Sequence, residues 1–424
     1  MTARLASRVL ARQAAGSYRS PAMKKTTGQD RSITSRWRPQ TRAVRAGTWR
    51  SEHGETSEAL FLTSGYCYDD AATVAARFAG EAEGMTYSRL QNPTVAMLEE
   101  RIAALDGAEA CRVQASGMAA MTTALLSQLK TGDHVVGGRA AFGSCRWLID
   151  NLLPRFGIET SVVDTGDNAA WEAAVRPNTK VFFFETPANP TMDIADIGFI
   201  CGLAKAHGIT SVVDNAFATA ALQRPLELGA DVVAYSATKL MDGQGRVLAG
   251  AVCSSKEWID TVLLPFQRNT GPNLSPFNAW VVLKGLETLS LRAFKQSDNA
   301  MKVGRFVEGR VPRMLHPGLP SHPQHNLAMR QMDAAGPIFS FVLDGGRAQA
   351  HAVLDALQLI DISNNIGDAK SLMCHPASST HANMGAEARE AMGVTEGMLR
   401  LNVGLEDPED VIEDLDQALS RAGL

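Results

Sequence analysis

The feature that most constrains the fold is a regular alternation of short apolar runs and amphipathic segments between residues 110 and 235. Strand-sized apolar runs occur at residues 111–114, 134–136, 160–163, 180–185, 211–213 and 232–235. Between them, apolar residues recur at helical spacing over 115–129, 144–153, 168–175 and 197–207. Because parallel strands need crossover connections, which are usually helices, this alternation predicts an α/β fold. We expect a mostly parallel sheet covered by helices on both faces.

The sequence outside this region predicts further parts. Asn92-Pro93-Thr94 is typical of a helix start, and the alternation breaks at residues 271–276, where a long helical stretch to about residue 308 begins. Later segments predict strands at 338–343 and 398–403 and helices at 347–357 and 408–422. We therefore divide the chain into a basic disordered extension (1–40), an N-terminal arm (41–90), a large domain (91–290) and a smaller C-terminal α/β domain (291–424).

Charge is distributed unevenly along the chain. Residues 1–40 contain nine basic side chains and one acid, which leaves 32 basic and 44 acidic side chains in residues 41–424. A body with excess acid has no general attraction for nucleic acid, so we expect no nucleic-acid partner. The basic leader has the composition of a transit peptide. We prefer to interpret it as a disordered extension or as translated sequence upstream of the true start.

Cysteine and histidine do not predict a metal site. The six cysteines lack C-x-x-C spacing, so we expect reduced thiols and a cytoplasmic location. His316, His322 and His325 lie close together in a Pro- and Gly-rich segment, where solvent-exposed loop histidines are commoner than metal ligands. No apolar run approaches the roughly 20 residues of a membrane span, so we expect no membrane partner.

Lys239 is the residue most indicative of chemistry. It directly follows the apolar strand 232–235 and the hydroxyl-bearing Ser236 and Thr238, although an ammonium group is costly to place near a core. Asp214 ends the preceding apolar strand, and ligands of parallel sheets bind at the carboxyl ends of strands. A Schiff-base lysine and an acidic partner for the pyridine nitrogen are what pyridoxal phosphate requires. We predict that Lys239 binds this cofactor; a surface lysine and a structural or helix-capping Asp214 are the alternatives.

Other residues suit the same ligand. Ser116-Gly117-Met118 begins a predicted helix, where backbone N–H groups bind phosphate, although a simple helix cap is the commoner use. Arg89 has the side chain to add charge to that phosphate, reaching over from another subunit. Phe142 could stack on a planar cofactor or simply belong to the core. Arg400 alternates with apolar residues in a strand and suits a substrate carboxylate or a structural ion pair.

Several ordered motifs resemble those of a known family, the Cys/Met-metabolism pyridoxal-phosphate enzymes, which are the cystathionine γ-synthase group of fold type I. The resemblance extends from about Thr41 to the end of the chain. The matching motifs are Tyr87-Ser88-Arg89, Asn92-Pro93-Thr94, Ala115-Ser116-Gly117-Met118, Glu185-Thr186-Pro187-Ala188-Asn189-Pro190, Val213-Asp214-Asn215-Ala216-Phe217, Tyr235-Ser236-Ala237-Thr238-Lys239 and Arg400-Leu401-Asn402-Val403-Gly404-Leu405-Glu406.

The resemblance implies a fold and a set of site residues. The fold is that of the aspartate aminotransferase-like transferases, with a seven-stranded, mostly parallel sheet. Lys239 would be the covalent anchor, with Asp214 at the pyridine nitrogen and Asn189 near the cofactor 3-hydroxyl. Phosphate would be held by Gly117, Met118, Ser236 and Thr238, with Tyr87 and Arg89 of a neighbouring subunit. Arg400 would bind the substrate carboxylate, and Ser371 would position this carboxylate and the lysine. A shared site implies an obligate dimer, and family members are usually tetramers.

Two departures from the common family pattern point to one subgroup. Phe142-Gly143 replaces the usual Tyr-Gly pair, so proton transfer falls to Lys239, and Asp242-Gly243-Gln244-Gly245-Arg246 follows the lysine. Both resemble the O-succinylhomoserine sulfhydrylases, which implies γ-replacement by sulfide to give homocysteine and succinate in methionine biosynthesis. O-acetylhomoserine sulfhydrylase, cystathionine γ-synthase and a γ-lyase are alternatives in the same fold. A non-catalytic pyridoxal phosphate carrier is an alternative of another class, although a carrier needs no Arg400.

Overall fold

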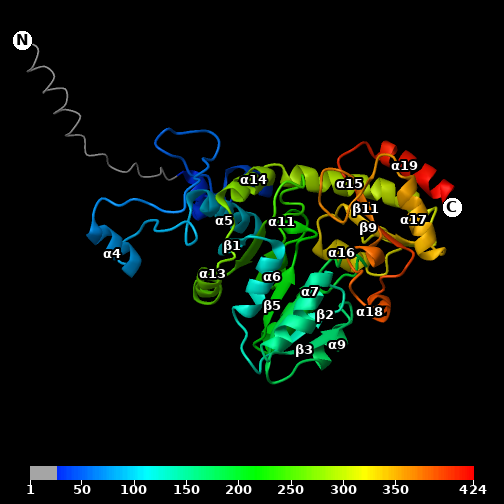
Figure 1. Ribbon diagram of the computed structural model, residues 1–424, viewed down its shortest axis with the longest axis horizontal. Coiled ribbons are helices and arrows are strands. Elements are labelled where there is room, and N and C mark those ends of the chain that lie inside the picture. The colour runs from blue at the N-terminus through cyan, green and yellow to red at the C-terminus, as the bar shows by residue number, and fades with distance from the viewer. Residues whose placement is uncertain (1–25) are drawn as a thin grey trace, which may run out of the picture.

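The computed structural model describes residues 26–424 and contains two β-sheets (Figure 1). The larger sheet has seven strands in the order β1-β7-β6-β5-β4-β2-β3. These strands are β1 (Ala110–Gln114), β2 (His134–Gly138), β3 (Glu159–Val163), β4 (Thr179–Glu185), β5 (Thr210–Asp214), β6 (Val232–Tyr235) and β7 (Gly250–Ser254). Strand β7 pairs antiparallel with both neighbours, and the other pairs are parallel. The predicted mostly parallel sheet is confirmed. Strand β7 is not among the apolar runs from which the sheet was predicted.

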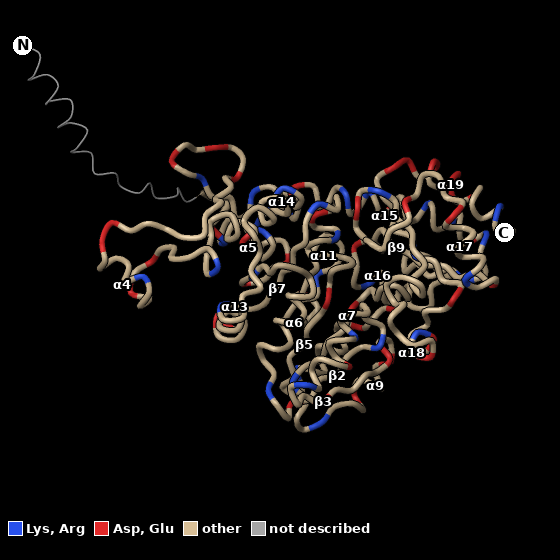
Figure 2. The backbone as a smooth tube through the Cα atoms, viewed as in Figure 1, with Lys and Arg blue, Asp and Glu red and all other residues tan. Residues whose placement is uncertain are grey.

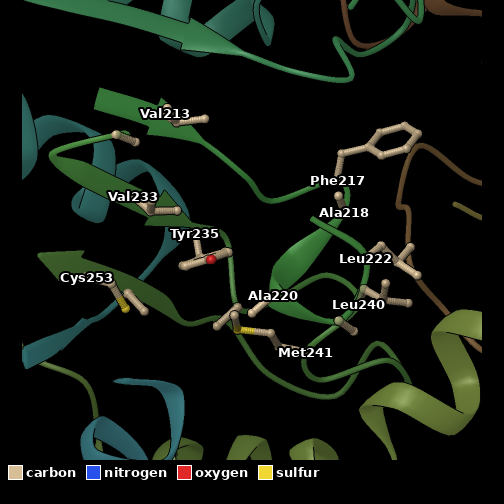
Figure 3. Close-up of a cluster of buried hydrophobic side chains, with 14 of the residues drawn as sticks. Val213, Phe217, Ala218, Ala220, Leu222, Val233, Tyr235, Leu240, Met241 and Cys253 are labelled. Atoms are coloured by element: carbon tan, nitrogen blue, oxygen red, sulfur yellow. The ribbon is translucent and has the colours of Figure 1, made fainter. Parts of the chain in front are cut away.

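Helices cover both faces of this sheet because its strands are apolar on both sides. In β4, Val181 and Phe183 pack in a cluster with residues of α6 (Gly117–Leu126). Phe182 and Phe184 point the other way, into a larger cluster with α5 (Pro93–Asp106) and α10 (Ile197–Ala206). Figure 3 shows part of this second cluster, which includes Val213, Val233 and Cys253 of adjacent strands together with Leu240 and Met241. The chain just after Lys239 is thereby anchored in the core.

The smaller sheet is built from later residues. Its strands are β8 (Arg313–Leu315), β9 (Ile338–Val342), β10 (Asp361–Ile362), β11 (Leu372–Cys374) and β12 (Met398–Asn402), in the order β10-β11-β12-β9-β8. Helices α15 (Leu289–Glu308), α17 (Gly346–Ala356) and α19 (Pro408–Arg421) supply the apolar cluster on one face. The opposite face of the smaller sheet contacts the loop that follows β4 of the larger sheet, where Ser340 Oγ donates to Pro190 O at 2.6 Å. The predicted domain division at residue 290 stays a prediction.

The predicted helical stretch over 277–308 consists of two helices, α14 (Pro276–Leu286) and α15, with a break between them. In a continuous helix the Gly285 carbonyl would accept from the backbone of residue 289. Instead, Arg292 Nη2 donates to Gly285 O at 2.8 Å, and Thr288 N lies 3.3 Å from the same oxygen. A buried arginine side chain therefore satisfies the carbonyl at the break.

The remaining α-helices connect these elements. They are α7 (Gly143–Trp147), α8 (Leu153–Arg155), α9 (Asn168–Ala173), α11 (Thr219–Leu222), α12 (Lys256–Trp258), α13 (Leu264–Thr270), α16 (His325–Gln331) and α18 (Ala386–Ala391). Lys and Arg are interspersed with Asp and Glu along the chain (Figure 2). Within residues 26–424, every helix is too short or too polar to cross a membrane.

The N-terminal region is more ordered than its composition predicts. Residues 1–25 of the predicted disordered extension lie outside the described residues. Residues 26–40 contain the turn η1 (Thr27–Gln29) and helix α2 (Arg31–Thr34) and lead into α3 (Pro39–Arg45), which corrects the expectation of disorder there. The Thr26 side chain caps η1, and Arg31 donates to the carbonyls of Ala108 and Glu109. Hydrogen bonding to the body therefore orders this part.

The arm over residues 41–90 is not extended throughout. It includes helix α4 (Ala71–Ala79), which projects away from both sheets in Figure 1. No residue of α4 is buried in the single chain, and Phe78 at its end is 67% exposed. A helix with this much unburied apolar surface is stabilised only weakly by its own chain.

The histidine loop also departs from expectation, because His316 and His322 are buried rather than solvent-exposed. Gly318 N donates to His316 Nδ1 at 2.9 Å, and Gln324 N donates to His322 Nδ1 at 3.2 Å. Burial lowers the pKa of His316 to about 3. Among residues 26–424, no cluster of His, Cys, Asp and Glu has a metal-binding arrangement. Burial therefore disfavours the protonated form of both rings, and His316 packs against Phe339 of the smaller sheet.

His316 makes stability pH-dependent. Its pKa is about 3 when folded and about 6.5 when unfolded, so the unfolded chain binds the additional proton as pH falls below 6.5. We expect this residue to remove roughly 2 to 3 kcal/mol of stability between pH 6.5 and 4.5. His316→Asn keeps an acceptor for Gly318 N and should flatten the decline in thermal midpoint over this range. Calorimetry at several pH values measures the difference, and parallel declines in both proteins would contradict the assignment.

Candidate active site

A cavity of about 550 Å³ lies where the parallel strands of the large sheet end, next to β12 of the smaller sheet. Its volume is within the range of small-molecule sites. The structure brings together many of the predicted site residues in its wall. They are Gly117, Met118, Phe142, Asn189, Asp214, Ser236, Thr238, Lys239 and Arg400.

Lys239 is held in this cavity by a residue that the sequence analysis did not identify. Its Nζ donates to Asn365 Oδ1 at 2.7 Å. Burial, with the nearby Arg400 charge, lowers the pKa of Lys239 to about 8. Gly367 has φ +71°, and a Cβ there would lie 2.4 Å from Leu240 N, so glycine permits this loop to approach the lysine. A polar Asn364-Asn365 pair before that glycine is the signal that could have indicated the contact.

The expectation for Ser371 is corrected by the structure. Its Oγ donates to Glu406 Oε2 at 2.9 Å and accepts from Gly404 N at 2.9 Å. Ser371 does not line the cavity that contains Lys239. Strand pairing of β11 with β12 fixes the adjacent residues, so the serine supports the chain after Asn402 instead of orienting the lysine. Asn365 occupies the position beside the amine that was expected of Ser371.

Asp214 lies at the end of β5 as a deeply buried acid. Ala216 N donates to its Oδ1 at 3.0 Å, and the Cys145 thiol lies 4.0 Å from Oδ2. Burial raises the pKa of Asp214 to about 7. Among the described residues, Asp214 forms no ion pair within 4 Å. A cationic ring nitrogen would provide the missing partner.

Glu185 is a second buried acid that the sequence analysis did not assign to the site. It ends β4 and accepts hydrogen bonds from Phe142 N at 2.6 Å and Asn189 N at 3.1 Å. Burial and the neighbouring Asp214 raise its pKa well above the ordinary value. The same side chain therefore positions two predicted cofactor contacts. An acid at the end of the wholly apolar run 181–184 was the available sequence signal.

The part of the cavity wall formed by the N-terminus of α6 and Ser236 suits a phosphate. The N-terminus of α6 faces Ser236, and a Cβ at Gly117 would lie 2.5 Å from the Ser236 Cβ, so glycine permits this approach. The first N–H groups of a helix have no partner inside the helix. Ser116 is a cap whose Oγ accepts from Ala119 N at 3.1 Å, and it does not line the cavity. Thr238 Oγ1 bonds Ala249, which fixes the turn before Lys239.

Arg400 is a buried cation without a carboxylate partner among the described residues. It points from β12 toward the cavity, because Leu399 and Leu401 on either side pack into the apolar cluster. Nη1 donates to Asn189 Oδ1 at 2.9 Å, and Nη2 donates to Asn364 O at 2.8 Å. Its Nε is buried and makes no hydrogen bond. A substrate carboxylate fits this unfilled bonding capacity.

Tyr87 and Arg89 do not reach this cavity within one chain. Arg89 donates to Arg268 O, and Tyr87 is 43% exposed. Both line a separate open hollow with Leu62 and Gly271. Their expected role in a neighbouring subunit's site stays a prediction.

The arrangement fits pyridoxal phosphate in its chemistry at both ends. A helix N-terminus with hydroxyl groups suits the phosphate, and the unpaired buried Asp214 suits a pyridine nitrogen. Lys239 lines the same cavity, and its lowered pKa makes a larger fraction of its amine neutral and nucleophilic than in an exposed lysine. The residues present therefore fit this cofactor.

Comparisons with known proteins identify the family. The family model for Cys/Met metabolism PLP-dependent enzymes matches residues 40–420. O-succinylhomoserine sulfhydrylase of Mycobacterium tuberculosis is 48% identical over 90% of this chain and 95% of its own length. The protein of that name from Pseudomonas aeruginosa is 47% identical over 90% of this chain and 94% of its own.

A solved structure extends the comparison to the fold. A Campylobacter jejuni protein described as an O-acetylhomoserine (thiol)-lyase, containing N'-pyridoxyl-lysine-5'-monophosphate, superimposes with a TM-score of 0.86. It is 34% identical, and the match covers 91% of this chain and all of that one. The fold type I architecture and the cofactor expected from the sequence are thus confirmed. This chain belongs to the Cys/Met metabolism PLP-dependent enzymes.

Proposed function

We propose that this enzyme catalyses γ-replacement on O-succinylhomoserine, in which sulfide displaces succinate and homocysteine forms. The observation that carries the proposal is that the buried Arg400, in the same cavity as Lys239, has no carboxylate partner among the described residues. Such an arginine suits the α-carboxylate of an amino acid substrate. The sulfhydrylase relatives support the choice of acyl donor and nucleophile. When bound, pyridoxal phosphate supplies the electron sink that acidifies the substrate Cα and Cβ protons.

The chain's own residues divide the work around the substrate. Arg400 binds the α-carboxylate and so places Cα within reach of Lys239. The Lys239 amine accepts the Cα proton and moves protons at Cβ, so that the succinyl ester leaves from Cγ and sulfide adds there. Asn365 Oδ1 orients the amine between these transfers. Phe142 offers a ring without a hydroxyl, so Lys239 carries the proton transfers.

The exposed side chains of the arm (residues 41–90) support an assembly in which each active site contains residues of two chains. Leu62 and Phe78 are 66% and 67% exposed, and Tyr87 and Arg89 lie outside the cavity of their own chain. We propose that the arm packs on a second copy and delivers Tyr87 and Arg89 to that copy's phosphate. We further propose that two such dimers form a tetramer, as the family resemblance implies. The described cysteines are free, and five of them are buried, which supports a cytoplasmic location.

Product analysis tests the function directly. The purified holoenzyme should convert O-succinylhomoserine and sulfide to homocysteine, and Lys239→Ala should lower kcat by at least about 10³-fold because its proton acceptor is missing. Each of the succinyl and acetyl esters should be assayed with sulfide and with cysteine. Preferred formation of cystathionine, or of an oxo acid and ammonia, would instead favour a synthase or a lyase. Undiminished turnover by Lys239→Ala would contradict the mechanism.

A pair of variants separates the two candidates for orienting the lysine. Asn365→Ala removes a hydrogen bond to an amine, which is worth roughly 10- to 100-fold in rate, and should lower kcat more than it changes KM. Ser371→Ala should change kcat less than about threefold, because Ser371 Oγ bonds Glu406 and Gly404. Steady-state kinetics of both variants measures this contrast. A larger kcat loss in Ser371→Ala would reverse the assignment.

Mixing two inactive variants tests the shared site. Arg89→Ala and Lys239→Ala should each be nearly inactive as homodimers, because each lacks one part of every site. After unfolding and refolding together in equal amounts, half of the dimers are mixed, and each has one intact site. We expect about a quarter of wild-type activity. Activity no greater than that of the separate variants would show that both residues act within one chain.

A further inference from the structure

The turn after Lys239 places a second arginine in the cavity wall. Residues 245–248 line the cavity together with Lys239. Asp242 holds the turn, accepting from Arg246 N at 2.8 Å and from Arg246 Nε at 2.9 Å. Arg246 Nη2 also donates to Asp242 O at 3.0 Å. Gly243 and Gly245 have positive φ, so the turn is tight and the Arg246 guanidinium is fixed at the wall.

The charged side chains at this turn have a net positive charge, and Arg246, one of them, lines the cavity. Asp242 is fully buried and lies near two guanidinium groups, those of Arg246 and Arg292. Arg292 is committed to the chain, since it donates to Leu240 O at 2.7 Å and to Gly285 O at 2.8 Å. The three side chains carry one net positive charge. Arg246 is 36% exposed, and its Nη1 makes no hydrogen bond to any described residue.

The substrate of the proposed function needs a further cation, and this inference rests on that function. O-succinylhomoserine has two carboxylates, whereas O-acetylhomoserine has one. Among residues 26–424, the cationic side chains in the cavity wall are Lys239, Arg246 and Arg400. Arg400 binds the α-carboxylate, and Lys239 transfers protons. The acids Glu185 and Asp214 in the same wall offer no positive charge to a second carboxylate. Arg246 is the remaining cation for the distal carboxylate.

We propose that Arg246 recognises the distal carboxylate of the succinyl group and is the residue that selects a dicarboxylic acyl ester over an acetyl ester. Guanidinium binds carboxylate through paired N–H groups, and Nη1 offers such donors. The Asp242 carboxylate holds Nε, and Nη1 makes no hydrogen bond to a described residue. The acetyl ester ends in a methyl group and would gain nothing from this contact.

The selectivity of a substituted enzyme tests the proposal. Arg246→Gln should lower kcat/KM for the succinyl ester by roughly 10- to 100-fold and that for the acetyl ester by less than about threefold. Arg139→Gln is a matched control, because Arg139 is a half-exposed arginine in an ion pair with Asp164 outside the cavity. The control should keep the wild-type ratio of the two esters.

A binding measurement supplies a readout without turnover. Succinate should bind the wild-type holoenzyme in calorimetric titration and should bind Arg246→Gln at least about tenfold more weakly. Because Asp242 is buried, losing its partner could unfold the single variant. The double variant Asp242→Asn with Arg246→Gln removes both charges together and is measured in the same way. It should show the same loss of succinyl selectivity.

The outcomes distinguish the two levels of the argument. A wild-type enzyme that uses neither ester with sulfide would overturn the proposed function itself. An active wild type whose succinyl-to-acetyl ratio is unchanged in the Arg246→Gln or double variant would overturn this inference alone. Equal losses for both esters would also overturn it, because they would indicate general damage to the site. A selective loss with weaker succinate binding would establish Arg246 as the specificity residue.

Discussion

The arrangement of the active site depends on two ionisable side chains that are buried without ion-pair partners among the described residues. Asp214 and Arg400 are both buried in the cavity wall, and neither has an ion-pair partner among the described residues. Uncompensated charge in a protein interior is costly unless a ligand completes it. The larger sheet holds Asp214 at the end of β5, the smaller sheet holds Arg400 in the middle of β12, and both residues line the same cavity. The cofactor and the substrate are the partners that this arrangement lacks.

The fold supplies the rigidity for that arrangement. The central strands of the large sheet are apolar on both faces, so helices cover both sides and the strand ends remain available to a ligand. Leu240 and Met241, directly after Lys239, are buried in the larger apolar cluster. Gly367, in the loop before β11, packs directly against Leu240. The lysine is therefore clamped from two directions, and its pKa is lowered by the enclosure.

Local patterns in the sequence predicted the fold and part of the site. The parallel strands and the positions of Lys239, Asp214 and Arg400 follow from apolar periodicity and from polar residues at strand ends. Asn365 was missed because its contact with Lys239 depends on a loop packed from a distant part of the chain. Ser371 was misassigned because a motif identifies a loop without fixing which of its side chains faces the ligand. Order in residues 26–40 arises from Arg31 bonding distant carbonyls, which composition does not reveal.

Glu185 links parts of the site that the chain separates. One carboxyl group accepts the backbone N–H of Phe142, in the loop after β2, and that of Asn189, in the loop after β4. A displacement of either loop therefore changes the geometry of the other through a shared support. Substitutions in the two loops should have non-additive effects on cofactor affinity. In the engineering or natural divergence of this enzyme, the stacking ring and the amide residue must change as one unit.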